Sequence, residues 1–80
     1  MRHVLINGDG VVLGILELPD APLWGDLWDA LLGALLYHYT EVSELEVDRT
    51  ADMNFTRIGN FVSNGVLIEF SLTETKTFKP

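Results

Sequence analysis

The side chains whose spacing could support chemistry are Glu44, Glu46 and Asp48, which alternate with Leu45 and Val47. Alternation at period two predicts a strand with the three carboxylates on one face and the apolar residues on the other. General acid–base catalysis requires two carboxylates in contrasting environments, one of them withdrawn from solvent. Three similar carboxylates on a solvated strand face therefore favour electrostatic binding or solubility over proton transfer.

Metal-binding and nucleophilic motifs are incomplete in this sequence. His38 and Glu41 have a spacing that could share a metal on a helix, but a metal site needs three or four ligands. A histidine near a helix end is more typical of a contact with the helix dipole. Residues 7–10 resemble the start of a calcium loop, yet the twelfth position is Leu18 instead of glutamate. We therefore predict a non-enzymatic protein that uses no metal and no cofactor.

Length and composition restrict the class of protein. The chain has 80 residues, a hydrophobic fraction of 48%, no cysteine and a formal net charge of −7. This size predicts a single domain spanning residues 1–80, and the hydrophobic fraction argues against intrinsic disorder. Lys and Arg number 5 against 12 Asp and Glu. Because phosphate contacts depend on basic side chains, we expect no direct binding to nucleic acid.

Apolar segments are too short or too interrupted for a membrane span or a signal peptide. The longest apolar stretch, residues 23–39, contains Asp26 and Asp29, and a spanning helix needs about 20 apolar residues. The apolar run at residues 4–6 is shorter than the central region of a signal peptide. We expect a cytoplasmic protein without membrane contact.

The N-terminal segment predicts a β-hairpin formed by residues 2–6 and 11–18. Asp9-Gly10 favours a type I′ turn between them, because both central positions of that turn need a positive φ. This turn gives one apolar face that is closed by an ion pair. The expected cross-strand pairs are Ile6 with Leu13, Val4 with Ile15, and Arg2 with Glu17.

A helix is predicted to begin near Pro22, with Asp20 or Ala21 at its N-cap, and to run to about His38. Its apolar residues recur at helical spacing: Trp24, Leu27, Trp28, Leu31, Leu32, Leu35 and Leu36. They form an arc about 200° wide, broader than one sheet contact requires.

The wide arc leaves two interpretations open. Strand edges and the C-terminal segment could cover both flanks of the helix. Alternatively, part of the arc, at Trp24, Trp28 or Leu36, is exposed and contacts another chain, including a second copy in a homodimer. Tryptophan is enriched in interface hot spots, which supports the second interpretation.

The C-terminal half predicts three further strands. One lies within residues 41–50, and a hairpin is centred on Asn64-Gly65. Its expected pairs are Ser63 with Val66, Phe61 with Ile68, Gly59 with Phe70, and Arg57 with Leu72. A second helix over residues 51–63 is the rival interpretation. The polar tail from Thr75 to Pro80, above all residues 76–80, is expected to fray.

Taken together, the elements predict an α+β fold of order ββαβββ, in which one amphipathic helix packs across an antiparallel sheet.

The charge is concentrated in the middle of this chain. Residues 17–52 hold nine acidic residues against one basic residue, a net charge of −8, and the remainder carries +1. Such a field attracts basic surfaces, although it also serves solubility.

Two functions follow as hypotheses. The first is an acidic interaction module that binds a basic protein surface, including the kind of surface that normally holds nucleic acid. By analogy of class alone, small acidic α+β proteins include phage and mobile-element inhibitors that act as nucleic-acid mimics. The second is a homo-oligomeric structural or assembly subunit that associates through the helix arc. The predicted partner-binding residues are Asp26, Asp29, Glu41, Glu44, Glu46, Asp48 and Asp52.

Overall fold

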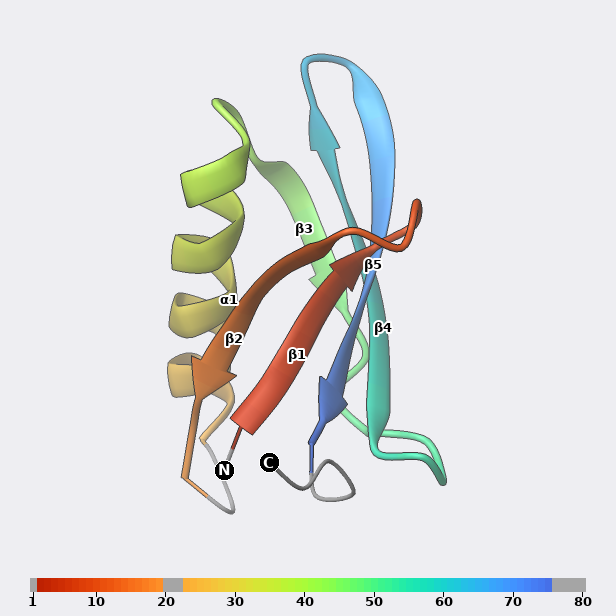
Figure 1. Cartoon of the computed structure of the whole chain (residues 1–80). Helices are drawn as coiled ribbons and strands as arrows, with labels where there is room; N and C mark the ends of the chain where they lie inside the picture. Colours follow the sequence, from red (N-terminus) through yellow and green to blue (C-terminus); the bar gives the residue numbers. More distant parts are fainter. Residues whose placement is uncertain (1, 20–22, 76–80) are drawn as a thin grey trace.

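The fold is the predicted ββαβββ arrangement, an α+β domain with one helix and one five-stranded antiparallel sheet (Figure 1). The structure is a computed structural model, and it describes residues 2–19 and 23–75. The elements are β1 (Arg2–Asn7), β2 (Val12–Glu17), α1 (Trp24–His38), β3 (Ser43–Val47), β4 (Thr56–Ser63) and β5 (Val66–Glu74).

The strands are ordered β2-β1-β5-β4-β3, so β5, the last strand in sequence, lies at the centre of the sheet between β1 and β4. Helix α1 lies on one side of the sheet (Figure 1). It buries Leu27, Leu31 and Leu35, which repeat every four residues and therefore share one face of the helix. The sheet contributes Leu5, Leu13, Phe61, Phe70 and Leu72 to the same core.

The β4–β5 hairpin has the register that the sequence predicts, with Ser63 opposite Val66 and Phe61 opposite Ile68. Gly59 lies opposite Phe70, and Arg57 lies opposite Leu72. A Cβ atom at Gly59 would overlap the Phe70 ring and the carbonyl oxygen of Glu46, which explains why glycine occupies this position. The rival helix over residues 51–63 is wrong, because β4 begins at Thr56.

The register of the β1–β2 hairpin agrees with the prediction at one end only. Arg2 lies opposite Glu17 and Val4 opposite Ile15, but Ile6 lies opposite Val12 and not Leu13. The cause is a β-bulge on β2, which adds one residue between the partners of Leu5 and Ile6. The bulge leaves Leu13 buried in the core under the helix.

The loop of this hairpin is not the predicted type I′ turn. Gly10 has a φ of 82°, but Asp9 has no positive φ. The Oδ1 atom of Asn7 accepts hydrogen bonds from the backbone N–H groups of Asp9 and Val11, both at 3.0 Å. These bonds organise a three-residue loop with glycine in the left-handed position, the arrangement that ordinarily gives a hairpin with a bulge.

Helix α1 begins at Trp24, later than predicted, and ends at His38 as predicted. Its N-cap is Leu23, which provides no side-chain hydrogen bond. The predicted start at Pro22 and the predicted caps at residues 20 and 21 lie outside the described residues. Within the described chain, no helix is both long enough and apolar enough to cross a membrane.

The end of the described chain is attached to the first strand. Thr75 donates two hydrogen bonds to the carbonyl oxygen of Arg2, one from its backbone N–H at 2.9 Å and one from its hydroxyl at 3.1 Å. The expectation that the tail frays from Thr75 onward is therefore wrong at this residue. Residues 76–80 lie outside the described part of the chain.

Candidate interaction surface

Strand β3 forms one edge of the sheet and carries the central carboxylates of the acidic segment. It spans residues 43–47, within the predicted range 41–50, and it contains a bulge between Ser43 and Glu46. Glu44 has a φ of 52° within this bulge, a backbone conformation that interrupts the regular alternation of side chains. Charges and bulges of this kind also keep an edge strand from pairing with other sheets.

Two shallow depressions, of about 500 and 300 Å³, run along β3 and β4 and share Glu46 and Asn60. We call them together the β3–β4 groove. Glu46 pairs with Asn60, which alternates along β4 with the buried Gly59 and Phe61. The groove therefore opens on the sheet face turned away from the helix. Its lining residues are Glu44, Leu45, Glu46, Val47, Asp48, Ile58, Gly59, Asn60, Val62 and Leu67.

The three carboxylates of the groove are exposed to solvent. Glu44 and Glu46 line the larger depression, and Glu46 and Asp48 line the smaller one. None of the three forms an ion pair with another described residue. Apolar side chains from neighbouring strands, Val62 and Leu67, lie beside them in the larger depression. The groove thus combines uncompensated negative charge with an apolar floor.

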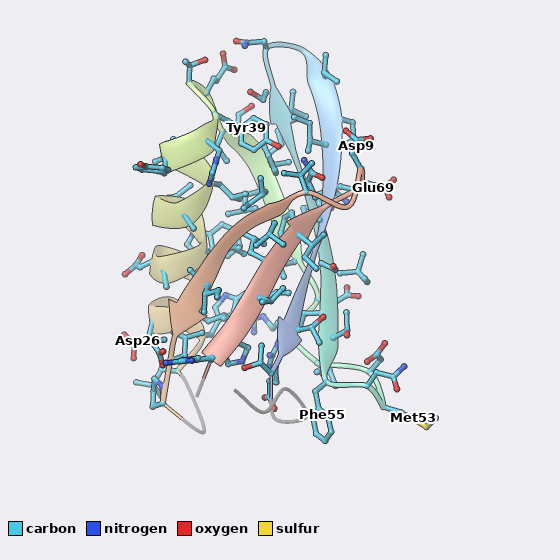
Figure 2. The ribbon with its side chains drawn as sticks, in the orientation of Figure 1. Asp9, Asp26, Tyr39, Met53, Phe55 and Glu69 are labelled. Atoms are coloured by element: carbon cyan, nitrogen blue, oxygen red, sulfur yellow. The ribbon has the colours of Figure 1, made fainter. Side chains whose placement is uncertain are left out.

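The remaining acidic residues of the predicted set lie elsewhere. Asp26 and Asp29 are exposed on helix α1, in the other layer of the fold (Figure 2 labels Asp26), and Glu41 is exposed in the connection from α1 to β3. Asp52 is exposed, but its Oδ1 accepts backbone hydrogen bonds from Asn54 at 2.8 Å and Thr56 at 2.9 Å. The structure therefore separates the helix carboxylates from those of the groove and gives Asp52 a role in shaping a loop.

The three helix residues predicted to contact a second copy also differ in their exposure. Trp24 and Trp28 are half-buried, with ring centroids 5.9 Å apart. The guanidinium carbon of Arg49 lies 5.0 Å from the Trp24 ring centroid, a cation–π contact that covers the indole face. Leu36 remains 50% exposed. The tryptophans thus contribute contacts within the chain, which leaves Leu36 as the accessible residue of the three.

Both histidines contact other residues of the fold. His38 donates a hydrogen bond from Nε2 to the carbonyl oxygen of Leu13. His3 is buried, with its Nε2 3.7 Å from Oε1 of Glu74. No group of three or more metal-ligating side chains occurs among the residues that the structure describes.

The groove contains residues that the sequence did not single out as functional. Asn60, Val62 and Leu67 come from β4 and β5, and no composition or motif distinguishes them from other strand residues. A signal existed only indirectly. The predicted pairing of Phe61 with Ile68 places Val62 beside Leu67 on the opposite sheet face.

Comparison of the chain with protein-family models, with curated proteins and with solved structures found no match.

Proposed function

We propose that this protein is a non-enzymatic binding module whose β3–β4 groove takes a basic segment of a partner protein. The observation that carries the proposal is the set of three exposed carboxylates, Glu44, Glu46 and Asp48, without ion-pair partners and beside an apolar floor. An arrangement of this kind suits a segment in which Lys or Arg side chains alternate with apolar ones, because such a segment satisfies both features together.

Charge alone is a weak source of affinity at an exposed site. A solvent-exposed ion pair contributes about 0–1 kcal/mol, so three pairs at the groove would give modest binding. The apolar floor at Val62 and Leu67 supplies the area from which water is removed. The carboxylates then act mainly on the rate of association and on the choice of partner.

A basic surface that normally holds nucleic acid is the partner class that this proposal favours. Proteins that grip phosphates concentrate Lys and Arg on one surface, and an acidic groove that occupies such a surface would exclude the nucleic acid. In this form of the proposal the protein acts as an inhibitor by occlusion. Its net charge of −7 would raise the association rate with such a partner, and salt would reduce that rate.

A synthetic peptide of alternating lysine and valine, carrying a fluorophore, provides a direct test by fluorescence anisotropy at rising salt. The groove variant is Glu44→Lys/Glu46→Lys, and its control is Asp26→Lys/Asp29→Lys on the helix. Both variants change the net charge by the same amount. We expect the groove variant to lose peptide binding and the helix variant to retain most of it. Equal losses in the two variants would mean that net charge, and not the groove, governs binding.

A further inference from the structure

On the sheet face turned away from the helix, an apolar area lies over β1 and β2, on the half of the sheet opposite the β3–β4 groove. Two cross-strand pairs form this area, Val4 with Ile15 and Ile6 with Val12, and we call these four residues the β1–β2 patch. Val12 is 56% exposed and Ile15 is 59% exposed. A sheet covered by a helix on one face ordinarily presents polar residues on the other. Four apolar side chains together on the uncovered face are therefore unusual.

Neighbouring residues on the same face show the contrast. On β5, the partners of Val4 and Ile6 are Thr73 and Ser71, which are the polar residues expected on an uncovered face. Apolar side chains return on β4 at Ile58, which pairs with Ser71. Among the described elements, none crosses this side of the sheet (Figure 1). The patch is thus continuous across two strands and open to solvent.

The charges around the patch restrict what can cover it. Within the patch there is no charged side chain, and at one end lies the ion pair of Arg2 with Glu17, 2.8 Å from Nε to Oε1. The acidic residues Glu46 and Glu69 lie on β3 and β5, outside the patch. A basic partner gains no electrostatic attraction at such a neutral area, whereas a second copy of this chain can bring its own Arg2 to the Glu17 at the end of the patch.

We propose that a second copy of the chain packs its own β1–β2 patch against this one and forms a two-fold symmetric dimer. A two-fold axis that runs along the strands between β1 and β2 places the patch on its own counterpart. The same axis sets Arg2 opposite Glu17 of the second copy, and Glu17 opposite Arg2 of that copy. Two sheets packed in this way lie about 10 Å apart with nearly aligned strands.

The size and surroundings of the patch set the strength of the dimer. Two exposed and two partly buried aliphatic side chains give an apolar area of at most a few hundred Å², so the interface is smaller than that of a stable complex and suits a weak dimer. Asp9, at the loop beyond the patch (Figure 2), approaches its counterpart at the rim and opposes association. The dimer should therefore depend on concentration, and the β3–β4 groove stays outside it on each copy.

Sedimentation equilibrium of the chain, over concentrations from micromolar to millimolar, tests this proposal with a matched pair of variants. Ile15→Lys introduces a charge into the patch, and Leu36→Lys introduces the same charge at a similarly exposed apolar residue of the helix. We expect the wild type and Leu36→Lys to dimerise and Ile15→Lys to raise the dissociation constant about tenfold or more. A wild type that stays monomeric throughout, or a dimer lost in Leu36→Lys and kept in Ile15→Lys, would overturn the proposal.

A second pair of variants keeps the test decisive if Ile15→Lys does not fold. In the dimer, residues 2 and 17 of the two copies lie together. Arg2→Glu would make all four of these side chains acidic and should therefore weaken the dimer. The double variant Arg2→Glu/Glu17→Arg exchanges the charges and should restore it. Because both residues are exposed, the monomer fold, followed by circular dichroism, should persist in each variant. A dimer that is indifferent to Arg2→Glu would contradict the proposed axis.

The salt dependence separates this dimer from the proposed binding of a basic segment. Two chains of net charge −7 repel one another, so salt, which screens the repulsion, should strengthen the dimer. Binding of the lysine–valine peptide should weaken over the same salt series. Each measurement can thus fail without the other, and a dimer that dissociates as salt rises would count against the neutral patch as its interface.

Discussion

The imidazole of His38 donates a hydrogen bond from Nε2 to the carbonyl oxygen of Leu13. This contact connects the last residue of α1 to the edge strand β2 at the point where the bulge shifts its pairing with β1. A bulge takes a residue out of the regular ladder, and here a side chain from another element supplies a hydrogen bond to that residue. His38 therefore stabilises the irregular part of β2.

Replacement of His38 by alanine should lower the free energy of unfolding by about 1 kcal/mol, the usual net contribution of one hydrogen bond. Urea denaturation followed by circular dichroism measures this difference. The control is Leu36→Ala on the same helix, which is 50% exposed, whereas the ring of Tyr37 contacts the His38 ring and would not be independent of it. An equal loss in both variants would indicate that truncating any side chain at this end of the helix has the same effect, and it would contradict a specific role for the His38 contact.

Substitution of Gly59 by alanine should destabilise the sheet by about 1–3 kcal/mol, because the added methyl group overlaps the Phe70 ring and the backbone of β3. Gly14→Ala is the matched control, since Gly14 also lies within a strand and an added Cβ there meets no atom within 4 Å. We expect that control to be neutral within about 0.5 kcal/mol. Chemical denaturation of the two variants, side by side, checks the prediction, and similar stabilities would refute it.

Two loops of the chain share one hydrogen-bonding pattern although their sequences differ. In the loop after β1, Asn7 Oδ1 accepts from the second and fourth following N–H groups, and Gly10 has a φ of 82°. In the loop before β4, Asp52 Oδ1 accepts from the equivalent two groups, and Phe55 has a φ of 59°. The left-handed position thus holds glycine in one loop and a bulky aromatic residue in the other, where it is strained.

This strain can be measured by removing the Phe55 ring in two ways. Phe55→Ala and Phe55→Gly delete the same aromatic contacts, but only glycine adopts the left-handed conformation freely. We therefore expect the glycine variant to be more stable than the alanine variant by about 1 kcal/mol in thermal or urea unfolding. Gly10→Ala in the matching loop should lose a similar amount. An alanine variant as stable as the glycine variant would show that the loop relaxes without strain.

Local patterns were sufficient to predict the element order and the β4–β5 hairpin. The pairing of Gly59 with Phe70 follows from the Asn64-Gly65 turn, because a short turn and the period of two determine every pair along both strands. The bulge at Leu13 could not be predicted in the same way. It depends on the helix, which is far away in sequence, covering Leu13 and bonding to its carbonyl group through His38.

The candidate site could be predicted only in part, and the rest was missed for a similar reason. Alternation along residues 44–48 correctly indicated a strand with exposed carboxylates, whereas the left-handed conformation of Glu44 has no sequence signal. The floor of the groove requires the neighbouring strands to be known, because the β3–β4 pairing brings Val62 beside β3 and the β4–β5 pairing brings Leu67 beside Val62. The separation of Asp26 and Asp29 from the groove likewise depends on which side of the sheet the helix covers.

The central position of β5 determines when during synthesis this fold can form. Among the described strands, the hairpin of β1 and β2 joins the rest of the sheet only through the pairing of β1 with β5, in which His3 lies opposite Glu74. An isolated two-stranded hairpin is at best marginally stable in water. During synthesis, the strands that precede β5 (Val66–Glu74) should therefore wait without a completed sheet until β5 leaves the ribosome, and the folding rate should be limited by a contact between segments far apart in sequence.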